Sequence, residues 1–126
     1  KCIAKSEHYD VMLLLSVFHY IDRDSFERHQ YGGGPRVQWT VKLMESILRL
    51  ARVTFIELPN QGTGVGWNRL PHVYEKFTTI RRFLKHAVKA SGLTKEVKGP
   101  IYWGCGTWGP DNDNQSTRWV FVVCDV

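Results

Sequence analysis

The sequence predicts an α/β fold in which parallel strand–helix–strand units are followed by an antiparallel hairpin. Residues 11–18 are an apolar run interrupted only by Ser16, as is typical of a strand buried on both faces of a parallel sheet. Strand-like and helix-like segments then alternate along the chain. The last two strand-like segments are joined by the polar link 108–117, which is too short for a crossover helix. We therefore expect a mostly parallel sheet with one reversed edge strand.

The individual elements follow from apolar periodicity and from stop signals. Helical spacing of apolar residues predicts three helices, over 21–29, 38–51 and 75–91. Enrichment in β-branched and aromatic residues predicts three further strands, over 53–58, 94–103 and 118–125. Gly92 stops the last helix, Asp24 is the candidate N-cap of the first, and the pair Gly99-Pro100 bends the strand that contains it.

Composition excludes several classes of protein. Hydrophobic residues make up 43% of the 126 residues and charged residues 23%, which is ordinary for a folded protein and argues against disorder. The apolar run at 11–18 is far shorter than the about 20 residues that a membrane span needs. The three cysteines form no CxxC pair and are odd in number, so neither a zinc site nor a disulfide framework is expected. A reducing, cytoplasmic location without a membrane span is the simplest prediction.

The chain is basic, with 17 Lys and Arg against 12 Asp and Glu and a net charge of +5. This charge would suit an anionic partner such as nucleic acid, but the basic residues are spread along the chain. The terminal hairpin also carries aromatic residues that could stack on bases, namely Tyr102, Trp103, Trp108 and Trp119. Aromatic residues on a sheet covered by helices more often belong to the core, and nucleic acid is therefore not the favoured partner.

The first strand has consequences for the completeness of the domain. A strand as apolar as 11–18 requires neighbours on both sides and helices on both faces, yet only the segment 53–58 is available beside it. Its other edge would expose N–H and C=O groups next to an apolar surface. We expect that residues upstream of Lys1, or else a partner chain, cover this edge. Residues 1–126 are thus predicted to be the C-terminal half of one domain.

Residues 9–20, which read Tyr-Asp-Val-Met-Leu-Leu-Leu-Ser-Val-Phe-His-Tyr, resemble the fourth strand of class I S-adenosylmethionine-dependent methyltransferases. That strand commonly reads aromatic-Asp, an apolar run, a small residue, two apolar residues and His. The later elements agree with this family in order: a helix, a fifth strand ending in an acidic residue (Glu57), a helix, and a hairpin of strands six and seven. The resemblance implies a Rossmann-like methyltransferase sheet. The N-terminal strands of that sheet and its glycine-rich cofactor loop have no counterpart here.

The resemblance also implies an activity, the transfer of a methyl group from S-adenosylmethionine to a nucleophilic acceptor. The acceptor is not identified, and a small molecule is favoured. Ligands of open α/β sheets collect at the carboxyl ends of the parallel strands. By the resemblance, Ser16 and Val17 would line the methionine end of the cofactor, with Phe18 close by.

Two residues at these strand ends are candidate catalytic groups. An imidazole has an unperturbed pKa of about 6.5, so His19 is suited to accept the proton of the nucleophile. The alternative is a structural histidine that donates to a backbone carbonyl. Glu57 is a candidate to orient a substrate hydroxyl or amine, or else to pair with a neighbouring arginine.

Substrate contacts are expected from the end of the first strand and from the loop that would fold over the crevice. These candidates are Tyr20, Asn60, Trp67, His72 and Tyr74. The segment 62–66 within this loop superficially imitates a dinucleotide-binding loop. Because Pro59 interrupts its approach and no strand with a terminal acid follows about 20 residues later, we interpret it as a flexible lid. No metal site is predicted. The alternative functions are a non-catalytic module with this fold and a basic nucleic-acid-binding domain.

Overall fold

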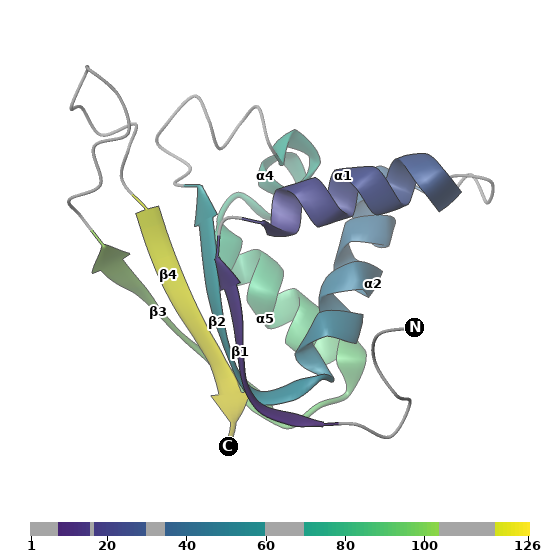
Figure 1. Ribbon diagram of the computed structural model, residues 1–126. Coiled ribbons are helices and arrows are strands. Elements are labelled where there is room, and N and C mark those ends of the chain that lie inside the picture. The colour runs from purple at the N-terminus through teal and green to yellow at the C-terminus, as the bar shows by residue number, and fades with distance from the viewer. Residues whose placement is uncertain (1–7, 16, 30–34, 60–69, 104–117) are drawn as a thin grey trace.

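The computed structural model describes residues 8–15, 17–29, 35–59, 70–103 and 118–126. The strands are β1 (Tyr9–Leu15), β2 (Ala51–Pro59), β3 (Lys95–Trp103) and β4 (Arg118–Asp125). The helices are α1 (Phe18–His29), α2 (Arg36–Leu48), α4 (Pro71–Phe77) and α5 (Ile80–Ser91). The strands form one sheet, and these helices lie on the same side of it (Figure 1). None of the helices in the described ranges is long and apolar enough to cross a membrane.

The strand order is β1-β2-β4-β3, which confirms the α/β fold and the antiparallel terminal hairpin. The predicted arrangement of the strands was wrong in one respect. Only β1 and β2 pair in parallel, and the reversed strand β4 lies inside the sheet, antiparallel to both β2 and β3. Residue character explains this order. β4 buries Phe121 and Val123, whereas β3 carries Lys95, Lys98 and Pro100, which suit an edge strand.

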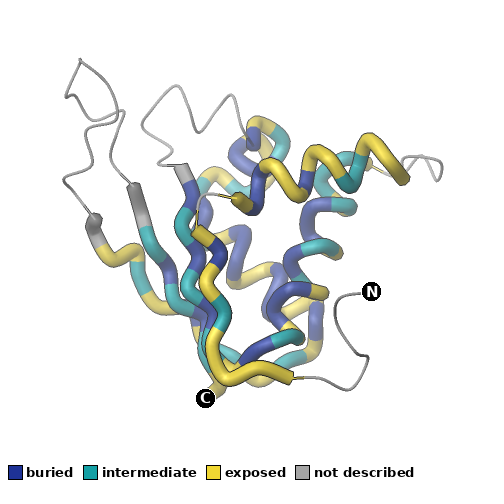
Figure 2. The backbone as a smooth tube through the Cα atoms, viewed as in Figure 1, coloured by how far each residue is buried: buried dark blue, intermediate teal, exposed yellow. Residues whose placement is uncertain are grey.

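Exposed residues alternate with less exposed ones along the second half of β1 (Figure 2). Leu14 is 5% exposed and points into the core, while Val11, Leu13 and Leu15 are 55%, 63% and 47% exposed. Side chains alternate between the faces of a strand, so these three residues share the outer face, away from the helices. The helices of the described ranges cover one face of this strand, and the prediction that its other face is also covered concerns residues outside these ranges. The apolar side chains on the outer face of β1 therefore stay exposed to solvent in the described structure.

The outer apolar face continues onto the next strands. Leu13 is in register with Phe55 of β2, which in turn is in register with Val122 of β4, and both neighbours are half-buried. Among the strands that the structure describes, β1 is also the end of the sheet, as predicted. An apolar sheet face beside an unpaired strand edge is a feature that proteins usually cover.

Helix α1 begins earlier than its sequence pattern suggested. Strand β1 ends at Leu15, and the carbonyl of Val17 accepts hydrogen bonds from the N–H groups of Tyr20 and Ile21, both at 3.0 Å. Phe18 thus lies in the first turn of α1 and is fully buried, with its ring centroid 6.2 Å from that of Phe83. The expected N-cap Asp24 lies inside the helix instead. The reason is that burial of Phe18 draws the chain into the helix almost two turns before Asp24.

The predicted helix 75–91 is two helices. α4 begins with Pro71 in its first turn and ends at Thr78, whose φ of 73° breaks the helical path. Thr79 then caps α5, because its hydroxyl accepts the N–H of Arg82 at 3.1 Å. Gly92 ends α5 with a left-handed φ of 75°, as predicted.

Two boundaries near the middle of the chain also differ from expectation. α2 ends at Leu48 and β2 begins at Ala51, so Ala51 belongs to the strand and not to the helix. Its apolar side chain, three residues after Leu48, continued the helical stripe in the sequence, and in the structure it is buried from the strand instead. The predicted bend in β3 is confirmed by a register shift between Lys98 and Ile101. At Gly99, with φ 112°, a Cβ would lie 3.0 Å from the carbonyl oxygen of Val120, which requires glycine.

The hydrophobic core lies between the sheet and α2 and α5. Its largest fully buried side chains are Phe18, Phe83, Phe121, Met44 and Leu48. α1 and α4 pack against α2 and α5 near the carboxyl ends of β1 and β2 (Figure 1). The candidate site is therefore built on this upper edge of the sheet.

Candidate functional site

The carboxyl ends of the two parallel strands meet at one edge of the sheet. Leu15, the last residue of β1, is in register with Glu57 of β2. Val17 and the first turn of α1, which contains His19 and Tyr20, come next in the described chain. The structure thus brings the candidates at the end of the first strand to the same sheet edge as Glu57, as expected for a ligand site in an open α/β sheet.

His19 and Tyr20 form an aromatic pair on the first turn of α1. His19 is 7% exposed, and its ring centroid lies 4.2 Å from that of the Tyr20 ring. Tyr20 is 44% exposed, and the guanidinium of Arg23 lies over its ring at 5.5 Å. Tyr20 is therefore the exposed member of this pair, and the cation of Arg23 packs on its ring.

The other residues of this group have different surroundings. Val17 is 41% exposed and precedes the first turn, where its side chain is accessible to a ligand. Phe18 is fully buried against Phe83, so in the described structure it packs the core. Glu57 is half-buried between Leu15 and Val120, and the alternation along β2 places it on the outer face.

His72 and Tyr74, which follow the predicted loop, lie in α4, so a helix begins before the predicted start at residue 75. Tyr74 is 3% exposed and belongs to the hydrophobic core, where burial raises the pKa of its phenol far above the ordinary value. Its hydroxyl therefore stays protonated at physiological pH. The remaining candidates, Ser16, Asn60 and Trp67, lie outside the described residues, as do the segment 62–66 and Trp108.

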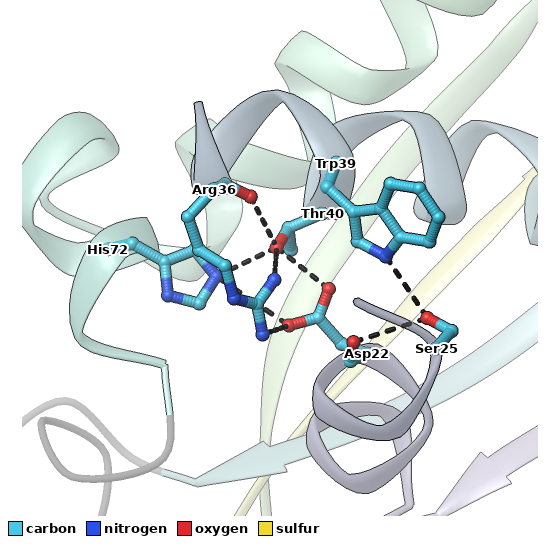
Figure 3. A network of polar contacts seen from close by, with 6 residues as sticks. All are labelled: Asp22, Ser25, Arg36, Trp39, Thr40 and His72. Carbon is cyan, nitrogen blue, oxygen red and sulfur yellow. Dashed lines mark hydrogen bonds and ion pairs between the residues drawn. The ribbon is translucent and has the colours of Figure 1, made fainter. Parts of the chain in front are cut away.

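His72 instead joins a buried polar network around Asp22 (Figure 3). Asp22 is fully buried on α1, and its carboxylate accepts a hydrogen bond from Arg36 Nη2 at 2.6 Å. The hydroxyl of Thr40 donates to the other carboxylate oxygen at 2.7 Å. His72 Nε2 lies 2.7 Å from the same hydroxyl and 3.6 Å from Asp22 Oδ2. The network ties α1, α2 and α4 together.

The charge state of Asp22 follows from these contacts. Burial alone would raise the pKa of this carboxyl, but hydrogen bonds with His72, Arg36 and Thr40 and the charge of Arg36 outweigh that effect and lower it. Asp22 is therefore ionised at neutral pH and paired with Arg36. A second layer extends the network, since Trp39 Nε1 donates to Ser25 Oγ at 3.0 Å and Ser25 Oγ donates to the Asp22 carbonyl at 3.2 Å.

Sequence reasoning missed Asp22, Arg36 and Thr40, although a signal was present. Asp22 is four residues after the buried Phe18, so it is an acidic residue on the inner stripe of a helix. Such a carboxylate requires a buried partner, and Arg36 and Thr40 are themselves spaced four residues apart. We interpret the network as the clamp that holds α1 and α4 at the upper edge of the sheet.

The described part of the chain contains no group of three or more side chains arranged to hold a metal ion. Comparison of the chain with protein-family models, with curated proteins and with solved structures found no match.

Proposed function

We propose that this chain is the C-terminal half of an S-adenosylmethionine-dependent methyltransferase domain that acts on a nucleophilic acceptor. The observation that carries the proposal is the resemblance of residues 9–20 to the fourth strand of class I methyltransferases. In the structure Tyr9–Leu15 of this segment form the strand β1, parallel to β2, and Phe18–Tyr20 lie in the first turn of α1. The antiparallel hairpin of β3 and β4 agrees with the same family.

The exposed outer face of β1 supports the half-domain part of the proposal. Val11, Leu13 and Leu15 are the residues that upstream strands and helices would cover. An N-terminal half that pairs with β1 would satisfy both the open strand edge and the apolar face.

The start of α1 fits the amino-acid part of the cofactor. The positive end of a helix dipole favours a carboxylate, and the first turn of α1 contains no acidic side chain that would oppose one. Val17 lies at this helix end and is accessible. When bound, the cofactor supplies an activated methyl group to the acceptor. His19 would take the proton of the nucleophile, and Tyr20 and Glu57 would position it in line with the transferred group.

Val17→Asp should weaken binding of S-adenosylmethionine by about tenfold or more, because its carboxylate would repel that of the ligand. Aspartate is a favoured residue at the start of a helix, so the fold should tolerate the change. Isothermal titration of the chain together with its upstream sequence measures the effect. Ile21→Asp is the matched control, since Ile21 is also 41% exposed and lies one turn further along α1. Equal affinities of the two variants would contradict the assignment of this helix end to the cofactor.

His19→Ala in the same extended protein should lower turnover by roughly 10²-fold with little change in cofactor affinity, because the proton acceptor is lost. Turnover is followed as methyl transfer to any acceptor that the parent protein modifies. His29→Ala is the control, because His29 is an exposed histidine at the far end of the same helix. Unchanged turnover combined with a lower melting temperature would instead identify His19 as a structural histidine.

A further inference from the structure

Helix α5 has an unusual distribution of charge. Its residues include Arg81, Arg82, Lys85, His86 and Lys89 but no acidic residue, and the helix buries Phe83, Leu84, Ala87 and Val88 on its other side. Two arginines occupy the first turn, where the helix dipole disfavours cations. A sequence that breaks this local rule is expected to have a compensating use for the positive charge.

Three of these cations line a groove between α5 and β3. A cavity of about 360 Å³ is bordered by Arg81, Lys85 and Lys89 from α5, by Lys95 and Glu96 from β3, and by two valines at its floor. The residues Arg81, Lys85 and Lys89 are spaced four apart, so they share one face of the helix and follow one another at intervals of about 6 Å. The cations thus form a row along the groove.

Contacts within the described ranges neutralise only the β3 side of this groove. Lys95 pairs with Asp125 at 2.6 Å, and Glu96 pairs with Lys98 at 3.7 Å. No carboxylate in the described part of the chain lies within 4.0 Å of Arg81, Lys85 or Lys89. Arg81 is also held in place, because its Nη1 donates to the carbonyl of Gly99. Its remaining N–H donors are therefore pre-oriented for an anion.

We propose that this groove binds the phosphate backbone of single-stranded nucleic acid. A row of evenly spaced cations suits a chain of phosphates better than a single anion. The groove residues include no aromatic side chain for stacking on bases, so recognition should be independent of sequence and sensitive to salt. This inference goes beyond methyl transfer and does not depend on it.

Fluorescence anisotropy with labelled oligouridylate and oligothymidylate tests the proposal on the full chain. Both should bind at low ionic strength. A plot of the logarithm of affinity against the logarithm of salt concentration should have a slope of about −2, as expected for three phosphate contacts on a single strand. Lys85→Gln/Lys89→Gln should lower affinity by about tenfold and reduce the slope to about a third. Lys42→Gln/Lys76→Gln is the matched control. It removes the same charge from two exposed lysines that do not line the groove, one on α2 and one on α4.

Several outcomes would overturn the proposal. Equal loss of affinity in the two double variants would mean that only the net charge of the protein matters. Binding of labelled polyglutamate as tight as that of the oligonucleotides would indicate an acidic polypeptide as the partner. Absence of binding at low salt by a chain with a cooperative melting transition would exclude the groove altogether. The result for Val17→Asp, which concerns cofactor binding, does not affect this test. The methyltransferase proposal and the nucleic-acid proposal can therefore be contradicted independently of each other.

Discussion

Arg36→Met should lower the free energy of unfolding by about 3 kcal/mol, because it leaves the buried carboxylate of Asp22 without its cation. Asp22 is fully buried, and Arg36 is the cation that contacts it at 2.6 Å. Urea unfolding followed by circular dichroism measures the change. A domain of this size is stable by only about 5–15 kcal/mol, so the loss would be readily detected.

The control for this variant is Arg28→Met. Arg28 also pairs with an aspartate, Asp24 at 3.0 Å, but both side chains are more than half exposed. Its loss should therefore change stability by less than about 0.5 kcal/mol. Asp22→Asn combined with Arg36→Met should recover much of the loss, because the double variant buries no unpaired charge. Similar effects of Arg36→Met and Arg28→Met would contradict the role assigned to the buried network.

The same variants should differ in their response to acid. The pKa of Asp22 is lowered from 3.8 in the folded protein, so its contribution to stability is complete above the unfolded value and is lost as the pH falls through the folded value. Without Arg36 the folded pKa of Asp22 should rise. Acid unfolding of Arg36→Met should then begin at a higher pH than acid unfolding of the parent protein. Asp22→Asn removes the titrating carboxyl, so a variant that carries it should lose the part of the pH dependence that comes from Asp22.

The 126-residue chain alone should bind S-adenosylmethionine at least about a thousandfold more weakly than the chain with its upstream sequence. In the methyltransferases that it resembles, the cofactor is held largely by a glycine-rich loop after the first strand and by an acidic residue that ends the second. Neither has a counterpart here. Titration calorimetry on both proteins tests this expectation. Micromolar binding by the monomeric 126-residue chain would contradict the half-domain proposal and would restore the segment 62–66 as a candidate cofactor loop.

Two neighbouring leucines of β1 provide a structural control for this second prediction. Leu13 is 63% exposed and Leu14 is 5% exposed. Leu13→Glu should therefore have little effect in the 126-residue chain but destabilise the extended protein by at least about 2 kcal/mol, because an N-terminal half would bury this position. Leu14→Glu should destabilise both. An extended protein that tolerates Leu13→Glu would show that the outer face of β1 stays exposed.

Much of the fold was predictable because its signals are local. The stop of α5 at Gly92 depends on one residue that adopts a left-handed conformation at low cost. The final strand, Arg118–Asp125, depends on a dense run of β-forming residues. The bend at Gly99 and the antiparallel pairing of β3 and β4 follow from a glycine-proline pair and a short connection. Each of these features needs only residues that are close in sequence.

The upper edge of the sheet was only partly predictable. Parallel β1 and β2 bring His19 and Glu57 to one edge by topology alone, and the sequence indicated this. The sequence did not predict that α1 starts at Phe18. This start depends on the burial of Phe18 against Phe83, which is far away in the chain. The break at Thr78 was missed because a threonine with a φ of 73° has no local signature. The conformation there is imposed by the packing of α4 and α5.

Local sequence alone thus determined the kinds of elements and their order, because periodicity and turn chemistry act over a few residues. Tertiary structure alone decided that β4 lies between β2 and β3 and that only one face of the sheet is covered by the described helices. It also assembled Asp22, Arg36 and His72 from three helices. Such arrangements depend on which surfaces bury the most apolar area and pair the most buried charge, and these are sums over residues distant in sequence.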